Sequence, residues 1–247
     1  MAQKIKTILI SQPKPTTEKS PYFDLAEKLK LTIDFRPFIH VEGVDAHEFR
    51  QQRIDLAEHT AVIMTSRNAV DHFFRLAEEM RFEVPDTMKY FCLSESTAFY
   101  LQKYVVYRKR KIFHGQVKFQ ELMDQIKKHK TERFLLPCSD LLKPSIPQAL
   151  EEGKINYTRA TMYRTVCSDL SDLSDVKYDM LVFYSPGGIE SLFRNFPDFV
   201  QGETRIATFG PTTQDAAREA GLRVDVPAPT VSAPSMTMAI EHYILGK

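Results

Sequence analysis

The sequence is poor in cysteine and lacks the spacing of common metal ligands. Its three cysteines, Cys92, Cys138 and Cys167, lie far apart and form no C-x-x-C motif. Its seven histidines are scattered, with no H-x-x-x-H or H-E-x-x-H pair. These absences argue against a disulfide framework and against a zinc site. We therefore expect reduced thiols and no metal.

The chain also lacks a strong charge of one sign and any long apolar run. Lys and Arg number 33 against 32 Asp and Glu, which leaves a formal net charge of +1. No stretch approaches the roughly 18 apolar residues that span a membrane. The apolar run in "MAQKIKTILIS" is too short for a secretory signal. We expect a cytoplasmic protein with neither a nucleic-acid nor a membrane surface. The basic run at 108–111 is interpreted as a solvated connection, as short charge runs usually are.

The usual catalytic signatures are missing as well. There is no G-x-S-x-G elbow, no G-x-x-x-x-G-K-[ST] loop and no G-x-G-x-x-G fingerprint. No pair of carboxylates stands out. A serine-hydrolase elbow, a nucleotide-binding P-loop and a dinucleotide site are therefore not expected.

What the sequence does contain is an alternation of apolar runs and helical patterns. Apolar runs occur at 6–11, 61–66, 133–139, 179–185 and 205–210, and helical patterns follow them at 20–30, 68–80, 144–153, 187–196 and 212–221. Such alternation predicts an α/β fold of parallel sheets with crossover helices. The runs are continuously apolar, which is typical of strands covered on both faces.

The pattern occurs twice. An apolar run, a turn with serine and an amphipathic helical pattern follow one another in both "TAVIMTSRNAVDHFF" and "DMLVFYSPGGIESLF". Ser66 in the first segment corresponds to Ser185 in the second, 119 positions later. "FCLSESTAFYL" resembles "ATFGPTTQDAA", which pairs Thr97 with Thr213. "TILISQPK" resembles "FLLPCSDLLK", and 34–42 resembles 159–167. Four units in one order predict a duplication, with two similar α/β domains and a cleft between them.

The repeated turns carry hydroxyls at predicted helix N-termini. "TSRNA", "SESTA", "SPGGI" and "GPTTQ" each follow a strand, where ligands of parallel sheets collect. A helix N-terminus offers free N–H donors and partial positive charge, and so binds carboxylate or phosphate. The alternative is that these residues are helix caps only, each worth about 1 kcal/mol. The two roles are compatible, because a capping hydroxyl can also face a ligand.

Together these motifs resemble the uroporphyrinogen-III synthase family. The resemblance rests on "IMTSRNAVDHFF", "SESTAFYL", "MYRTV", "FYSPGGIESLF" and "ATFGPTTQDAAREAGLRVDVPAPT", and covers nearly the whole chain. It implies a bilobed α/β protein whose chain leaves one domain and returns to it. The first domain would hold residues 1–36 and 168–247, and the second would hold 37–167. The segments 34–42 and 159–167 would form a two-stranded bridge.

The resemblance also implies a reaction. A synthase of this family cyclises hydroxymethylbilane to uroporphyrinogen III, with loss of water and inversion of ring D, in haem biosynthesis. The enzyme would be a cyclising lyase without cofactor or metal. We expect a monomer that could receive its substrate from the preceding pathway enzyme. The substrate carries eight carboxylates, which accounts for a site built from helix N-termini and hydroxyls.

Carried over position by position, the family's bridging-strand tyrosine falls on Tyr163, as a hydrogen-bond donor to the departing hydroxyl. Its alternative role is a packed interface tyrosine. The expected substrate-binding residues are Thr65, Ser66, Thr97, Ser185, Gly187, Gly188, Ile189, Gly210, Thr212 and Thr213. The motif does not settle whether Thr212 or Thr213 faces the substrate. The sequence departs from the family pattern at Gln12, Ser94 and Tyr184.

Two other functions fit parts of the sequence. The turns alone permit a non-catalytic two-lobed protein that binds a small polyanion. The run "YRKRK" permits a nucleic-acid module, which would bind with steep salt dependence. Turnover of hydroxymethylbilane separates the enzyme from both.

Overall fold

The chain forms two compact units. The computed structural model describes residues 5–17, 19–116, 118–142, 144–173 and 175–246. Unit 1 combines residues up to 40 with those from 166 onward, and unit 2 holds 41–165. The family resemblance implies boundaries at 36/37 and 167/168, and the compact units divide at 40/41 and 165/166.

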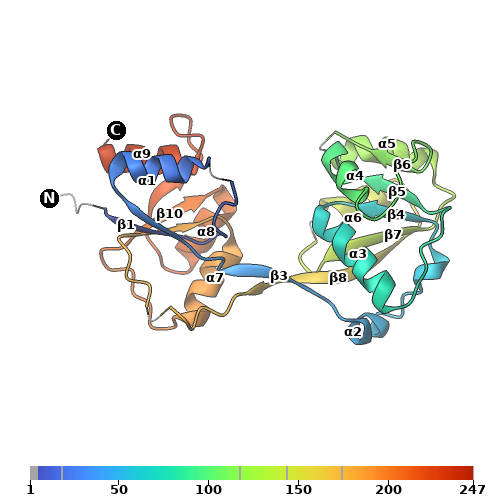
Figure 1. Cartoon of the computed structure of the whole chain (residues 1–247), viewed down its shortest axis with the longest axis horizontal. Coiled ribbons are helices and arrows are strands. Elements are labelled where there is room, and N and C mark those ends of the chain that lie inside the picture. The colour runs from blue at the N-terminus through green and yellow to red at the C-terminus, as the bar shows by residue number, and fades with distance from the viewer. Residues whose placement is uncertain (1–4, 18, 117, 143, 174, 247) are drawn as a thin grey trace. The chain divides into compact units, whose positions relative to one another are not determined.

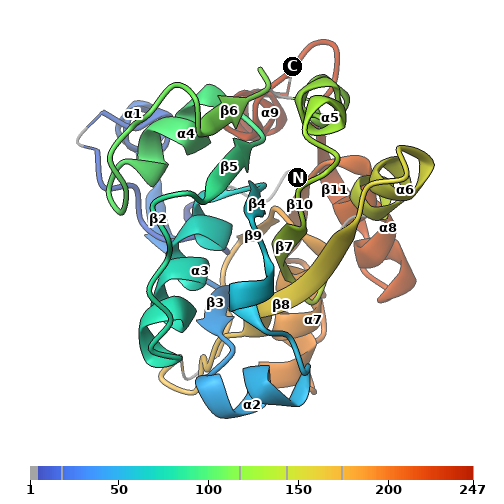
Figure 2. The ribbon, with the colours of Figure 1, turned by 90° about the vertical axis from the view of Figure 1, so that its right-hand side faces the viewer.

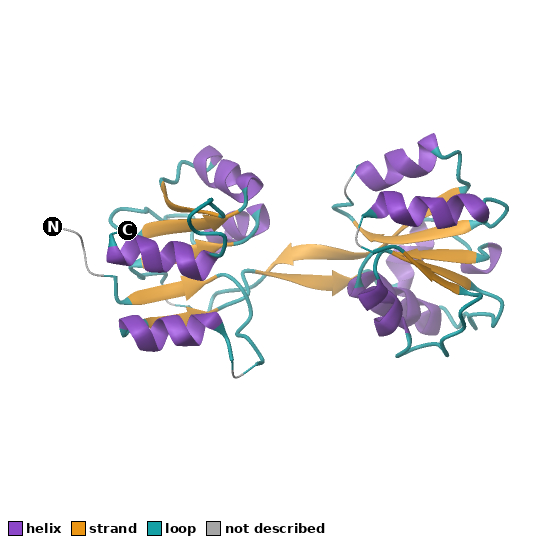
Figure 3. Cartoon of the chain, turned by 90° about the horizontal axis from the view of Figure 1, so that it is seen from above, coloured by secondary structure: helices purple, strands orange, loops and turns teal. Residues whose placement is uncertain are grey.

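Unit 1 is a parallel sheet with helices on both faces (Figures 1 and 3). Its strand order is β11-β10-β9-β1-β2, and each neighbouring pair is parallel. The strands are β1 (Thr7–Ile10), β2 (Thr32–Phe35), β9 (Met180–Phe183), β10 (Arg205–Phe209) and β11 (Val224–Ala228). The helices are α1 (Pro21–Leu29), α7 (Pro186–Asn195), α8 (Pro211–Glu219) and α9 (Met236–Leu245).

Unit 2 holds the second sheet, with the order β3-β8-β7-β4-β5-β6. The strands are β3 (Ile39–Gly43), β4 (Ala61–Met64), β5 (Lys89–Cys92), β6 (Ile112–His114), β7 (Phe134–Ser139) and β8 (Tyr157–Cys167). The helices are α2 (Ala46–Gln51), the 3₁₀ helix η1 (Leu56–Glu58), α3 (Arg67–Glu79), α4 (Glu95–Leu101), α5 (Phe119–Lys128) and α6 (Ser145–Glu152). Figure 2 shows α3 and α4 on one side of the sheet and α5 and α6 on the other.

The two sheets repeat one topology. The order β6-β5-β4-β7-β8 in unit 2 matches β11-β10-β9-β1-β2 in unit 1 strand for strand, in the pairing that the sequence repeat predicts. The predicted parallel α/β architecture is confirmed in both units. The duplication is therefore visible in topology as well as in sequence.

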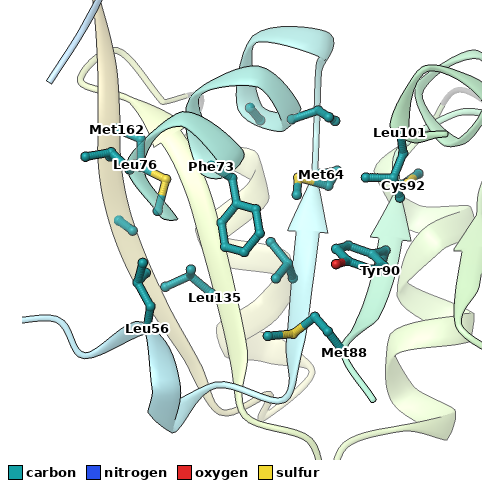
Figure 4. Packing of buried hydrophobic residues seen from close by; sticks show 14 of the residues in the cluster. Leu56, Met64, Phe73, Leu76, Met88, Tyr90, Cys92, Leu101, Leu135 and Met162 are labelled. Atoms are coloured by element: carbon teal, nitrogen blue, oxygen red, sulfur yellow. The ribbon is translucent and has the colours of Figure 1, made fainter. Parts of the chain in front are cut away.

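The continuous apolar runs are explained by strands packed on both faces. In β4, Val62 and Met64 join the cluster beneath α3 and α4, while Ala61 and Ile63 join the cluster beneath α5 and α6. Figure 4 shows the first of these clusters, in which Met64 and Phe73 lie at the centre. All four residues of β4 are fully buried. A strand with helices on both faces has no polar side, so its sequence cannot alternate.

The chain crosses between the units within β3 and β8. Each strand contains one of the unit boundaries, and the two are neighbours in the sheet order. Hydrogen bonds join Ser168 N to Phe38 O at 2.8 Å in unit 1 and Val44 N to Met162 O at 3.0 Å in unit 2. The segment 34–42 is interrupted after Phe35 and resumes at Ile39, whereas its counterpart lies within a single long strand.

Within the described part of the chain, no helix is both long and apolar enough to cross a bilayer.

Candidate active site

Each sheet changes its winding direction between two central strands. In unit 1, β9 leads to α7 on one face and β1 leads to α1 on the other, because residues of α7 and α1 belong to different clusters. In unit 2 the same reversal falls between β4 and β7, which lead to α3 and α6. Open α/β sheets bind ligands outside the carboxyl ends of the strands at such a point. Ser66 and Ser185 each cap the helix that begins there.

The unit 2 edge brings Ser66 and Tyr163 together. Ser66 Oγ accepts from Ala69 N at 3.1 Å and lies 3.3 Å from Tyr163 Oη. Tyr163 pairs with Ser139 at the end of β7, beyond a register shift, and Asp140 N donates to its carbonyl at 3.3 Å. The phenol and two serines therefore stand at the carboxyl ends of β4 and β7.

The unit 1 edge has the same plan without the phenol. Ser185 Oγ accepts from Gly188 N at 3.3 Å. Phe38 stands where unit 2 has Tyr163, and its backbone N–H donates to Ser11 O at 3.5 Å. The Phe38 ring meets Phe183 edge to face, with centroids 5.7 Å apart. Ser11 thus lies beside Phe38 as Ser139 lies beside Tyr163.

The two glycines after Ser185, Gly187 and Gly188, differ in how much space a side chain would have. A Cβ on Gly188 would lie 3.3 Å from Phe183 Cδ1 and 3.6 Å from Ser11 Oγ. A Cβ on Gly187 would meet only Ile39, at 3.4 Å, so its backbone is the more open. Ile189 is buried in the cluster beneath α7. The Ile189 side chain packs in the core, so only the Ile189 backbone is available to a ligand.

The two threonine turns match in the position and burial of their threonines. Thr97 and Thr213 are each the third residue of their helix, and both are buried, at 5% and 1% exposure. Thr212 and Ser96 precede them and are exposed. Thr65 is half-buried at the end of β4. The exposed hydroxyls on these two turns are therefore Ser96 and Thr212.

The turn before α8 differs from the other three in its cap. Gly210 adopts a φ of +88°, which a residue with a side chain rarely takes, and no side chain caps the helix. Ser66, Ser94 and Ser185 each accept a hydrogen bond from an N–H of the first turn. Among the first turns of α3, α4, α7 and α8, only that of α8 has no side-chain oxygen as its cap. A ligand oxygen could therefore accept hydrogen bonds from its N–H groups.

The surroundings of Tyr163 favour the protonated phenol. The side chain is 7% exposed, and burial raises the pKa of Tyr163 above its usual value, although the Ser66 hydrogen bond opposes the rise. A protonated phenol can donate a hydrogen bond at neutral pH. Among the residues that the structure describes, no group of three or more His, Cys, Asp or Glu is placed to hold a metal ion.

Sequence reasoning missed three of these residues. Ser11 and Ser139 end equivalent strands, yet neither lies in a motif that draws attention to it. Ser96 is the counterpart of Thr212 by the same 116-residue offset that pairs Thr97 with Thr213. Applying the repeat to every hydroxyl would have found Ser96, whereas Ser11 and Ser139 come together with Phe38 and Tyr163 only in the folded sheets.

Comparison with known proteins agrees with this architecture. The model of a family described as uroporphyrinogen-III synthase HemD matches residues 21–238. The chain belongs to the uroporphyrinogen-III synthase family. Enzymes of this family are cyclising lyases of tetrapyrrole biosynthesis, so the non-catalytic alternative is not favoured. No curated protein matches the chain in sequence.

Two solved structures of synthases share the fold. Uroporphyrinogen-III synthetase from Helicobacter pylori is 18% identical with a TM-score of 0.63, covering 98% of this chain and 100% of that one. A mutant uroporphyrinogen III synthase from the extremely thermophilic bacterium Thermus thermophilus is 17% identical with a TM-score of 0.55, covering 98% and 100%. At these identities the likeness establishes the fold and leaves the site residues to be argued from this chain.

Proposed function

We propose that the chain binds hydroxymethylbilane through the serine-capped turns at the carboxyl ends of its strands and that Tyr163 assists the loss of water. The family match over residues 21–238 is the observation that carries the overall activity. The pairing of Tyr163 Oη with Ser66 Oγ at 3.3 Å supports the assignment of the donor.

The proposed reaction needs a hydrogen-bond donor for the departing hydroxyl rather than a nucleophilic side chain. The bilane loses its terminal hydroxyl with a proton, as water, and the resulting carbon electrophile forms the bond that closes the ring. A phenol that donates a hydrogen bond to the departing oxygen would stabilise the charge that develops on it. Inversion of ring D requires that its existing bridge bond breaks and re-forms at its other α-carbon. The remaining contribution of the protein is orientation of a flexible chain, so that this course is favoured over direct closure to the I isomer.

The helix N-termini suit the substrate's carboxylates. The uncapped first turn of α8, the exposed Thr212 hydroxyl and the open backbone of Gly187 are the donors that we assign to carboxylate binding. Ser66 and Ser185 contribute their hydroxyls while they cap their helices. Thr97 and Thr213, being buried, shape these turns more than they touch the substrate.

We further propose a cytoplasmic monomer that takes the bilane directly from the enzyme that makes it. The three cysteines are free, with Cys92 and Cys138 buried, which supports a reducing compartment. Direct transfer would limit spontaneous closure to the I isomer.

The test is turnover of hydroxymethylbilane by the full chain, with uroporphyrinogen III resolved chromatographically from the I isomer. The III isomer should dominate in proportion to the protein added. Formation of the I isomer alone, at the rate without protein, would contradict the proposed activity.

A further inference from the structure

One face of the Tyr163 ring is covered by an imidazole. The His72 ring stacks on it with centroids 5.1 Å apart and an angle of 18° between the planes. His72 lies in α3, the helix that Ser66 caps, so this helix supplies both the contact to the phenol hydroxyl and the contact to the ring face. Offset stacking of this kind fixes where an aromatic ring can lie.

His72 is itself held by Arg75. Arg75 Nε donates to His72 Nδ1 at 3.2 Å, and Arg75 Nη2 donates to Val44 O at 2.7 Å and to Met162 O at 3.4 Å. Its Nη1 is paired with Glu79. The guanidinium therefore joins α3 to the main chain next to Tyr163, and the imidazole lies between that anchor and the phenol.

A glycine makes room for the anchor. A Cβ placed on Gly43 would lie 2.6 Å from Arg75 Nη2 and 2.7 Å from Cζ, closer than side-chain carbons approach. No positive φ accounts for a glycine here. The small residue at position 43 is accounted for by the path of the guanidinium.

The duplicated half has neither the imidazole nor the phenol. By the 119-residue offset, Ser191 takes the place of His72, and its hydroxyl is bonded to Asn195. Phe38 takes the place of Tyr163. The two rings thus occur together in one unit and are both replaced in the other, which links the imidazole to the phenol rather than to the fold.

We propose that His72, anchored by Arg75, is a positioning residue that holds the Tyr163 phenol against Ser66. This inference rests on the proposed role of Tyr163. The Arg75 hydrogen bond also selects the neutral tautomer with its proton on Nε2, because Nδ1 must accept.

The charges around His72 agree with a neutral ring. Burial lowers the pKa of His72 and the positive charge of Arg75 lowers it further, while Asp71 and Glu79 act in the opposite direction. An imidazolium would have no lone pair for the Arg75 Nε–H group. The stack is therefore between two neutral rings at physiological pH.

The experiment measures kcat and KM of the full chain for His72→Ala, Tyr163→Phe and the double variant. His72→Ala should lower kcat about tenfold with little change in KM, since misplacement of a catalytic group by about 1 Å can cost up to about 100-fold. In the Tyr163→Phe background, His72→Ala should lower kcat no further. His72→Phe keeps a ring that can stack, and it should recover part of the loss.

Two controls separate positioning from stability. His129→Ala also removes an imidazole packed on aromatic rings in unit 2, those of Phe91 and Phe113, and should leave kcat unchanged. Gly43→Ala should displace Arg75 and reproduce the kcat loss with His72 present. In His72→Ala the Tyr163 signal moves through loss of the imidazole ring current alone, so NMR of ring-labelled tyrosine, with Tyr163 assigned from Tyr163→Phe, is read in Gly43→Ala, which keeps the imidazole. There the Tyr163 ring signal should shift.

The outcomes are distinguishable. Equal kcat losses from His72→Ala with and without the Tyr163 hydroxyl, or an unmoved Tyr163 signal in Gly43→Ala, would overturn the positioning role. If Tyr163→Phe keeps the wild-type kcat, the proposed role of Tyr163 fails. The Tyr163 signal of Gly43→Ala then still decides whether the anchored imidazole positions the ring. Should His72→Ala not fold, His72→Phe and Gly43→Ala carry the same comparison.

Discussion

One position of the repeat decides whether a unit carries a phenol. Unit 2 has Tyr163 and unit 1 has Phe38, and both rings are buried beside a serine that ends a strand. The fold therefore accepts a phenyl ring at this place without a hydroxyl. What the phenol adds is a donor next to Ser66.

Tyr163→Phe should lower kcat at least roughly tenfold, since acid assistance typically contributes about 10²–10⁴-fold. The melting temperature should change little, because a hydroxyl hydrogen bond contributes about 0.5–1.5 kcal/mol net. Tyr157→Phe is the matched control, as it removes a hydroxyl bonded to Glu151 from the same strand. A wild-type kcat for Tyr163→Phe would show that the Tyr163 hydroxyl does not contribute to catalysis. The ring would then only pack at the site, and catalysis would depend on substrate orientation and backbone donors.

The two adjacent threonines of α8 should respond differently to truncation. Thr212 is exposed, so Thr212→Ala should leave stability within about 0.5 kcal/mol. If its hydroxyl binds a substrate carboxylate, KM should rise roughly tenfold. Thr213 is 1% exposed, so Thr213→Ala should lower the free energy of unfolding by roughly 1 kcal/mol with a smaller effect on KM. Steady-state kinetics and denaturant titration check both, and the reverse pattern would assign the substrate contact to Thr213.

At the scale of the element, the junction of β1 and β9 depends on one carboxylate. Asp179 accepts from Lys6 N at 2.7 Å and from Thr7 N at 2.9 Å, just before both strands begin. Partial burial raises the pKa of Asp179, but the hydrogen bonds from Thr7 and Lys6 outweigh it and lower the pKa overall. The ionised group therefore stabilises the start of the parallel pair.

The sign of the pH effect follows from that lowered pKa. The contribution of Asp179 is complete above the ordinary aspartate pKa of about 3.9 and is lost as pH falls through the lower folded value. Asp179→Asn should thus destabilise the protein at pH 7 and reduce the loss of stability on acidification below about pH 4. Urea titrations between pH 7 and pH 3 measure this, with the exposed Asp198→Asn as control. An unchanged slope in Asp179→Asn would show that other carboxylates set the acid limit.

Strands with a continuous apolar run could be predicted from the sequence. The break in the segment 34–42, which leads from one sheet to the other, could not. β4 and β9 are apolar on both faces, and they fall within their predicted runs. The segment 34–42 reads as one extended stretch, yet the strand breaks at residues 36–38. Pro37 has no N–H to donate there. His72 escaped notice because its role depends on a contact with Tyr163, 91 positions away, which no local pattern encodes.

At the scale of the whole molecule, the site residues follow from duplication rather than from any local motif. Identical strand orders place Ser66 and Ser185, and likewise Ser11 and Ser139, at equivalent carboxyl ends. The repeat pairs Ser66 with Ser185 and Phe38 with Tyr163, so the inequality of the two edges can be predicted from the sequence. The contacts of Tyr163 with Ser66 and His72 join positions far apart in the chain, and no local pattern predicts them.

The duplication and the chain path together predict that the units fold separately. Unit 2 is one continuous segment with its own buried clusters and sheet, so residues 39–167 should fold cooperatively alone. Unit 1 is made of both ends of the chain, but Ser168 N bonds to Phe38 O at 2.8 Å, so its two pieces are already adjacent. Joining residue 38 to residue 168 through a short Asn-Gly type turn should therefore close unit 1 without unit 2.

Circular dichroism and thermal melts of the two separated units check this, and each should show one cooperative transition. A matched control joins residue 30 to residue 168 and so removes β2 from the edge of the sheet, which should abolish cooperative unfolding. If residues 39–167 stay unfolded while the joined unit 1 folds, unit 2 depends on contacts that its own buried clusters do not supply. If neither folds, the two sheets are stable only as parts of one chain, and the repeat is a feature of topology without being a unit of stability.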